Sequence, residues 1–428
     1  MLRRLLWSST PLIALFVWVS TFAAAPAPRS RNFDWPQWQG QDRTAVSRET
    51  GLLKEWPKEG PPLLWKLDTL GGGYSTPSIA AGRIFGMSYR GDDEIVWALD
   101  ETTGKELWTA KIATANRKVG YGEGSRCTPT VDGDVLYALG VSGDLVCLKT
   151  ASGSEVWHKN LLKDFAGRVG GWKYSESPLI DGDKLLCTPG GKKATLLALN
   201  KKTAETIWMA AVPGGDEAAY SSIVAADVDG QRQYIQFLGG GVVGVTADKG
   251  EFLWRYKAPS AGINCTTPIY HDQCVYAAAA YNKGGGLVKL TREGDKVKAD
   301  EVYFHKDMQN HHGGLVLLDG YLYGEGSGNL VCMEFKTGKE MWRADKPGKG
   351  KAKPGKGSIA YADGRLYYRN EGGPIYLVEA TPERVVINGR FEQPKRSRNS
   401  AWPHPVIANG KLYIRDQQYL YCYDVKQK

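Results

Sequence analysis

Helical sequence patterns and catalytic motifs are both scarce in this chain of 428 residues. Beyond the N-terminus almost no apolar stretch has the 3.6-residue period of an amphipathic helix, which favours an all-β fold. The sequence contains no serine nucleophile elbow, no Cys-x-x-Cys zinc pair and no dinucleotide-binding glycine fingerprint. We therefore assign no catalytic residue from the sequence.

Three segments approach a ligand-binding motif without completing it. Residues 350–356 resemble a phosphate-binding loop, but Gly357 stands where Ser or Thr is required, and a strand is expected where the motif needs a helix. Residues 227–230 resemble a calcium loop but lack the downstream Glu. His311 and His312 are adjacent, and adjacent residues of a strand point to opposite faces, so a shared metal would require an irregular loop. We predict no metal site.

The seven cysteines are an odd number, so at least one thiol stays free. Cys147, Cys332 and Cys422 occupy the same place in three sequence repeats, where other repeats have alanine. This favours small apolar packing residues over a disulfide framework. Cys265 and Cys274 are the only close pair, and a bridge between them remains open.

What the sequence does contain is one motif repeated eight times with a period of about 46 residues, which is typical of propellers and solenoids. Its clearest copy is Ala-Leu-Asp-Glu-Thr-Thr-Gly-Lys-Glu-Leu-Trp at residues 98–108, and Leu64-Trp65 is an isolated first copy. Two copies, near residues 289–303 and 378–385, lack the tryptophan. Each unit also has an earlier hairpin turn, usually Asp-Gly or Asn-Gly, whose residues accept positive φ angles.

Each unit is therefore expected to form four short antiparallel strands. Eight such sheets packed radially bury their faces against one another, so we predict an all-β, eight-bladed β-propeller. The last unit stops without its tryptophan strand, and Leu63-Leu64-Trp65-Lys66 fits that vacancy, so the N-terminal strand should close the ring. We expect the propeller to span residues 62–428 as a monomer, preceded by a Trp-rich extension at 26–61.

The first 25 residues have the order of a secretory signal: Arg3-Arg4, an apolar run and small residues before Pro26. An uncleaved membrane anchor is the competing interpretation. We favour cleavage, because Ser8, Ser9, Thr10 and Pro11 interrupt the run, and this leaves no stable membrane span. The protein is then expected to be periplasmic or secreted.

Positive charge is concentrated in one loop of a chain whose net charge is +9. This basic loop contains Lys346, Lys349, Lys351, Lys353 and Lys356 among Gly and Pro residues. In an exported protein such a loop favours an envelope protein or an anionic polymer as its partner over nucleic acid. A soluble loop without a partner is the alternative.

Aromatic and polar residues gather in the segments that lead into the first strand of each unit. Such segments converge on one rim of a propeller, where loops on a rigid scaffold bind ligands. The alternative is that each aromatic residue covers only its own blade. The rim candidates, in chain order after Tyr74 and Tyr121, are Arg126, Trp172, Lys173, Tyr174, Glu176, Tyr220, Asn264, His311, His312, Arg398, Trp402 and His404.

The Leu-Asp-x-x-Thr-Gly-Lys-x-x-Trp repeat resembles the pyrroloquinoline-quinone (PQQ) repeat family of β-propellers. The opening Trp35-Pro36-Gln37-Trp38-Gln39-Gly40 is similar to exported PQQ-like proteins abundant in planctomycetes. The family includes quinone-dependent alcohol dehydrogenases and the non-catalytic BamB-type scaffold of outer-membrane protein assembly. The resemblance implies the fold more strongly than the function.

Most of the functional residues of the quinone-dependent dehydrogenases have no aligned counterpart in this sequence. In those enzymes a disulfide between two adjacent cysteines packs against the quinone, and no two cysteines are adjacent in this sequence. Glu176 and Asn264 could supply calcium ligands on the rim, although no motif aligns them. The BamB-type lipoproteins have a cysteine directly after the signal, whereas the first cysteine here is Cys127. We expect an exported, non-catalytic scaffold without a cofactor; a PQQ- and calcium-dependent alcohol or sugar dehydrogenase and a carbohydrate-binding propeller are the alternatives.

Overall fold

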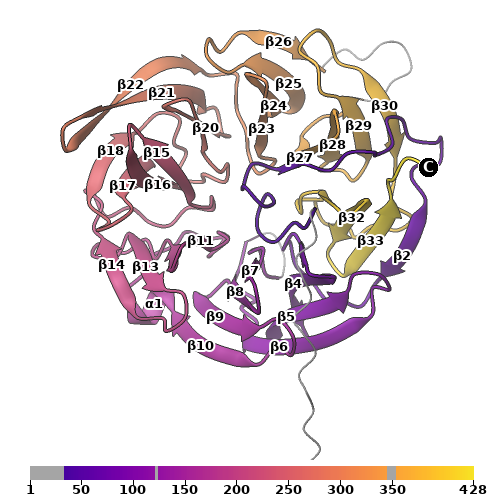
Figure 1. Cartoon of the computed structure of the whole chain (residues 1–428), viewed down its shortest axis with the longest axis horizontal. Coiled ribbons are helices and arrows are strands. Elements are labelled where there is room, and N and C mark those ends of the chain that lie inside the picture. The colour runs from indigo at the N-terminus through magenta and orange to yellow at the C-terminus, as the bar shows by residue number, and fades with distance from the viewer. Residues whose placement is uncertain (1–32, 121–123, 345–352) are drawn as a thin grey trace, which may run out of the picture.

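Eight β-sheets surround a central channel in the computed structural model, which describes residues 33–120, 124–344 and 353–428 (Figure 1). The innermost strand of each sheet lies near the channel and the outermost strand forms the perimeter (Figure 1). Each sheet is therefore one blade, and the predicted eight-bladed propeller is confirmed. Expected features of residues 1–25, including the signal sequence, lie outside the described residues.

The first four blades have four antiparallel strands each, in chain order from the channel outward. Blade 1 comprises β3 (Ser78–Ala80), β4 (Arg83–Arg90), β5 (Asp93–Asp100) and β6 (Glu106–Thr114). Blade 2 comprises β7 (Thr130–Asp132), β8 (Val135–Leu139), β9 (Asp144–Lys149) and β10 (Glu155–Asn160). Blade 3 comprises β11 (Leu179–Asp181), β12 (Lys184–Cys187), β13 (Leu196–Asn200) and β14 (Thr206–Ala210). Blade 4 comprises β15 (Val224–Val228), β16 (Gln231–Leu238), β17 (Gly241–Thr246) and β18 (Phe252–Tyr256).

The other four blades follow the same plan, and two of them take a strand from the N-terminal part of the chain. Blade 5 comprises β19 (Ile269–His271), β20 (Cys274–Ala279), β21 (Gly284–Glu293) and β22 (Lys296–His305). Blade 6 comprises β23 (Leu315–Leu318), β24 (Tyr321–Gly326), β25 (Asn329–Glu334) and β26 (Glu340–Arg343). Blade 7 comprises β27 (Gly357–Ala362), β28 (Arg365–Asn370), β29 (Ile375–Glu379), β30 (Ile387–Phe391) and the added β1 (Val46–Ser47). Blade 8 comprises β31 (Val406–Ala408), β32 (Lys411–Asp416), β33 (Tyr419–Asp424) and β2 (Leu63–Leu67).

The ring is closed as the sequence predicted, by a strand from the beginning of the propeller. β2 pairs antiparallel with β33, with Trp65 opposite Cys422 and Lys66 opposite Tyr421. Figure 1 shows β2 on the perimeter outside β33. Because β2 continues directly into blade 1, this one sheet joins the two ends of the ring.

The repeat tryptophan explains why its motif contains glycine. Trp108 of β6 reaches the turn of blade 2 and donates from Nε1 to the carbonyl oxygen of Thr150 at 3.0 Å. A Cβ atom on Gly153 in that turn would lie 2.5 Å from the Trp108 ring. Gly153 has a φ of 72°, a conformation that glycine adopts without steric cost. The indole thus packs directly on the turn of the next blade.

The same contact recurs around the ring. Trp65 covers Gly104, and Trp208 covers Gly250 while donating to the carbonyl of Ala247 at 3.3 Å. Blade 5 differs, because its outer hairpin β21–β22 is extended and its turn carries no such motif. Trp254 accordingly turns back and donates to Gln233 of its own blade at 2.9 Å.

The N-terminal segment before β2 crosses the channel instead of forming a separate unit (Figure 1). Trp35 forms a bridge with Ile79 of blade 1, and Trp38 donates from Nε1 to Thr267 of blade 5 at 3.0 Å. Arg43 donates to the carbonyl oxygens of Ser177 and Pro178 of blade 3. This segment therefore ties together blades on opposite sides of the channel, which the sequence did not predict.

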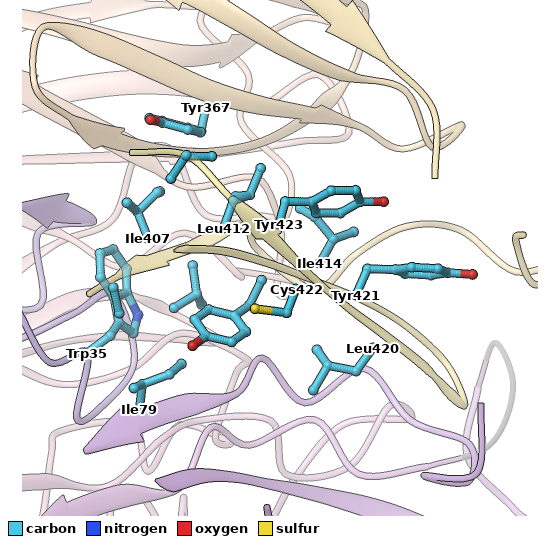
Figure 2. Close-up of a cluster of buried hydrophobic side chains, with 14 of the residues drawn as sticks. Trp35, Ile79, Tyr367, Ile407, Leu412, Ile414, Leu420, Tyr421, Cys422 and Tyr423 are labelled. Carbon is cyan, nitrogen blue, oxygen red and sulfur yellow. The ribbon is translucent and has the colours of Figure 1, made fainter. Parts of the chain in front are cut away.

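The apolar core lies between neighbouring blades, as it must when each four-stranded sheet buries both faces. Around blade 8, Figure 2 shows Leu412, Ile414 and Leu420 between Tyr367 of blade 7 and Ile79 of blade 1. All these side chains are buried. Closure of the ring by β2 thus also completes a continuous apolar cluster.

Two further expectations concern the cysteines and the membrane. All seven cysteines are free, and Cys265 and Cys274 are not bridged. The described residues form one α-helix, α1 (Leu161–Asp164), capped by Asn160. Among these residues no helix has the length and apolarity needed to span a membrane.

Candidate functional site

A cavity of about 610 Å³ lies where the segments before the innermost strands converge. All eight of these segments contribute to its wall, each just before the first strand of its blade. One residue from each, in chain order, is Tyr74, Arg126, Trp172, Tyr220, Cys265, His311, Lys356 and Trp402. The volume falls within the range of pockets that hold a small ligand or a few side chains.

The structure brings most of the sequence-predicted rim residues to this cavity. Those that line it are Arg126, Trp172, Tyr220, His311, His312, Trp402 and His404, together with Lys356 of the basic loop. Lys173 and Arg398 lie outside the lining, and Arg398 borders a second depression near Gln417. Lys346, Lys349, Lys351 and Tyr121 are outside the described residues, and Lys353 is exposed.

Three of the predicted rim residues are instead part of the blade framework. Tyr174 is buried and donates to the carbonyl oxygen of Pro189 at 2.8 Å. Glu176 is buried and accepts from Thr188 and Gln236. Asn264 is buried, and its amide donates to the carbonyl oxygen of Leu238 at 2.7 Å. These three side chains point into the blades, whereas their sequence neighbours Ser175, Ile263 and Cys265 line the cavity.

These contacts also decide whether the site suits calcium and a quinone. Calcium requires several oxygen donors directed at the ion. Both carboxylate oxygens of Glu176 are used by Thr188 and Gln236, and the Asn264 side-chain oxygen accepts from the backbone of Ala261 at 2.9 Å. Neither residue lines the cavity, so they do not fit the role of calcium ligands. No quinone chemistry is assigned to this site.

Aromatic rings form a continuous arc along one side of the cavity. Tyr74 packs on Trp402 with ring centroids 4.7 Å apart, and Trp402 lies 5.5 Å from His312. His312 contacts His311 at 5.1 Å, and His311 contacts Tyr281 at 5.2 Å. Such an arc offers flat faces to an apolar or ring-shaped group.

The three histidines of the cavity are held neutral. Burial lowers the pKa of His311 to about 4, with a further contribution from Lys356, and burial lowers the pKa of His404 to about 4. Burial and the neighbouring His311 hold the pKa of His312 well below its usual range. His311 and His312 face each other through their Nδ1 atoms at 3.3 Å, in the irregular loop that the sequence required for such contact. No group of three His, Cys, Asp or Glu side chains suited to a metal occurs among the described residues.

Two cations and two carboxylates line the cavity: Arg126, Lys356, Glu325 and Glu371. Glu325 accepts from the backbone N–H groups of His311 and Gly328. Lys356 forms an ion pair with Glu371 at 3.2 Å, and Glu371 also accepts from Trp402 Nε1 at 2.6 Å. Arg126 lies 5.4 Å over the Tyr74 ring and donates to the carbonyl oxygen of Gly120 at 2.7 Å. No carboxylate among the described residues forms an ion pair with Arg126.

Sequence reasoning missed part of the lining. Trp38 reaches it from the N-terminal segment, where it lies 4.6 Å from His404. Tyr281 and Glu371 lie in the hairpin turns between the second and third strands of their blades, and Glu325 lies near the end of β24, just before such a turn. The Trp-rich segment at residues 35–38 was the available signal for Trp38. Nothing in the sequence pattern distinguishes the hairpin residues from ordinary turn residues.

The comparisons with known proteins agree with this architecture. The family model described as outer membrane protein assembly factor BamB matches residues 16–164, 92–344 and 326–427. The outer membrane protein assembly factor BamB of Shewanella oneidensis is 26% identical over 250 residues, which are 52% of this chain and 58% of that relative. The aligned region therefore spans little more than half of the relative's length.

Solved structures show the same fold at low sequence identity. BamB from Moraxella catarrhalis superposes with a TM-score of 0.59 and 15% identity, covering 86% of this chain and 98% of that chain. A quinohemoprotein alcohol dehydrogenase from Comamonas testosteroni gives a TM-score of 0.64 and 13% identity, covering 92% of this chain and 81% of that chain. Binding proteins and enzymes thus share this ring.

The fold and its cavity define an eight-bladed propeller of PQQ-type repeats. Since the family model covers most of the chain, the chain belongs to the BamB family of these propellers.

Proposed function

We propose that this protein is an exported, non-catalytic scaffold that binds a protein partner in the cell envelope through the face that carries the cavity. The observation that carries the proposal is the convergence of all eight blade-entry segments on one aromatic-lined cavity. Family membership supports the same class of function, because the matched relative is an assembly factor for outer membrane proteins. Export by the N-terminal 25 residues is part of the proposal.

The chemistry of the cavity supports binding over catalysis. The buried histidines are neutral, and His404 already donates from Nε2 to the carbonyl oxygen of His312 at 2.9 Å. The carboxylate of Glu371 is engaged by Lys356 and Trp402. Aromatic residues and arginine, which are enriched in the centres of protein interfaces, make up much of the wall.

Site-specific photo-cross-linking in the native host tests this proposal. A photoreactive amino acid replaces Trp172 at the cavity, and in the matched control it replaces Leu107, which is exposed on the perimeter strand β6. We expect a discrete adduct with an envelope protein from position 172 and none from position 107. The same adducts from both positions, or none from position 172, would reject the cavity face as the docking surface.

A further inference from the structure

Arg126 is half-buried, and it has fewer hydrogen-bond acceptors among the described residues than the buried arginines Arg43, Arg369 and Arg415. A guanidinium carries five N–H donors, and burying them unpaired is costly. Arg415 donates to Gln417, Ser75, Met87 and Ser88. Arg126 has one hydrogen-bond acceptor in the described part of the chain, the carbonyl oxygen of Gly120.

Arg43 and Arg369 also make more hydrogen bonds than Arg126. Arg43 makes three hydrogen bonds, to Gln37 and to two backbone carbonyl oxygens of blade 3, and its buried Nε has no partner among the described residues. Arg369 makes three hydrogen bonds, to Gln393 and to the carbonyl oxygens of Pro403 and Arg415, and its buried Nε likewise has no partner among the described residues. Both are fixed parts of the framework, whereas Arg126 lines the cavity.

The surroundings of Arg126 orient the guanidinium without neutralising it. Its side chain lies over the face of Tyr74, at the end of the aromatic arc that continues through Trp402. A cation over a tyrosine face is stabilised by the ring's quadrupole but keeps its charge. Of the two lining carboxylates, Glu371 pairs with Lys356 and Glu325 accepts from the backbone N–H groups of His311 and Gly328, so neither is paired with Arg126.

We propose that Arg126 is the receptor for a carboxylate, and that the docking segment of the protein partner inserts an acidic side chain flanked by apolar or aromatic residues into this cavity. The guanidinium fork would hold the carboxylate, which is the geometry that arginine is suited to. The aromatic arc would pack against the flanking residues. This inference rests on the proposed function, since it names the chemistry of the same partner.

Charge outside the cavity favours an acidic protein segment. Lys395 and Arg398 lie in the loop before blade 8, which also supplies Trp402 to the cavity wall, and both are exposed. Lys356 and the exposed Lys353 belong to the loop before blade 7. A segment with several acidic residues therefore meets positive charge at two neighbouring entries to the cavity, which also accelerates association.

Peptide binding to the purified protein tests the inference. The probes are acetyl-Phe-Glu-Phe-amide and its neutral counterpart acetyl-Phe-Gln-Phe-amide, followed by peptide NMR line broadening. We expect the Glu peptide to bind about 10- to 100-fold more tightly, as a charge-assisted pair in a partly buried site allows. Arg126→Gln should abolish this preference, and Arg126→Lys should retain part of it.

Controls separate the role of Arg126 from general charge and from misfolding. Lys202→Gln removes one exposed positive charge from the turn between β13 and β14, away from the cavity lining and its entries, and should leave the preference intact. The thermal midpoint of each variant shows that it is folded. Equal binding of the two peptides, no binding of either at millimolar concentration, or a preference that survives Arg126→Gln would overturn the inference. Binding of a glucuronic acid oligosaccharide without binding of the Glu peptide would also overturn it, in favour of an acidic glycan.

Failure of this inference differs from failure of the proposed function. If the cross-link from position 172 persists while Arg126→Gln leaves peptide preference and cross-linking unchanged, the scaffold stands and the carboxylate receptor is rejected. If the Glu peptide binds through Arg126 but no envelope protein is cross-linked, the receptor stands and the scaffold is rejected.

Discussion

Substituting Gly153 by alanine tests the contact between blades that the repeat motif encodes. Two costs apply: the φ of 72° is unfavourable for alanine, and the new Cβ would lie 2.5 Å from the Trp108 ring. The left-handed conformation costs about 1–2 kcal/mol. Crowding a packed contact adds about 1–3 kcal/mol. We expect Gly153→Ala to lower the free energy of unfolding by about 2–5 kcal/mol.

Gly133→Ala is the matched control for the backbone cost. Gly133 has a φ of 62°, and no atom lies within 4 Å of the position its Cβ would take. It should therefore cost only about 1–2 kcal/mol. Urea and thermal unfolding of the two variants measure the difference. Adding Gly153→Ala to a Trp108→Ala background should cost no more than Gly133→Ala, because the clashing ring is gone. Equal destabilisation by Gly153→Ala and Gly133→Ala in the native background would refute the role of the Trp108 contact.

Three further outcomes follow from the structure. Deleting residues 62–67 removes β2 and leaves β33 as an open edge of its sheet. We therefore expect thermal unfolding to lose its cooperativity. A single transition at the original midpoint would contradict closure of the ring by β2. Burial raises the pKa of the Glu94 carboxyl group from 4.5 to about 7. Between these pH values the folded state therefore binds more protons than the unfolded state. The contribution of Glu94 to the free energy of unfolding falls as the pH rises through this window. Glutamine does not ionise, so Glu94→Gln should remove this loss. The free energy of unfolding of Glu94→Gln minus that of the wild type should be more positive at pH 8 than at pH 5. A difference that does not depend on pH would disprove the reasoning. Cys265 and Cys274 are not bridged, so a thiol reagent should titrate seven thiols in the denatured protein. A reductant should leave the midpoint of thermal unfolding unchanged. A count of five thiols would indicate a disulfide.

The sequence predicted the ring because its determinants are local. Asp-Gly turns, alternating apolar residues and the tryptophan of each repeat specify a blade without reference to distant residues. The missing strand of the last unit and the isolated Leu64-Trp65 then specified closure, which β2 and β33 form. These features repeat, so each copy supports the others.

The path of the N-terminal segment could not be predicted in the same way. β1 adds to blade 7 by a parallel pairing of Val46 with Tyr361, more than 300 residues away. Trp38 similarly contacts His404 across the channel. Contacts of this kind occur once in the chain and leave no periodic signal.

The candidate site was predictable in position but not in detail. Entry segments converge on the cavity, yet Tyr174, Glu176 and Asn264 from those segments point into the blades. Ser175 lines the cavity, whereas the next residue, Glu176, is buried and hydrogen-bonded within the blade. Sequence position alone does not distinguish two such neighbours. The small number of acceptors around Arg126 among the described residues likewise depends on which groups the fold brings near it.

Thermal unfolding with and without PQQ and calcium tests most directly whether this propeller binds a partner or carries a quinone. A ligand that binds only the folded state raises the midpoint in proportion to its occupancy. Our account predicts no shift, because Glu176 and Asn264 are used within the blades and offer no calcium ligand to the cavity. A rise of several degrees that requires both PQQ and calcium, on the order expected at a hundred times the dissociation constant, would contradict it.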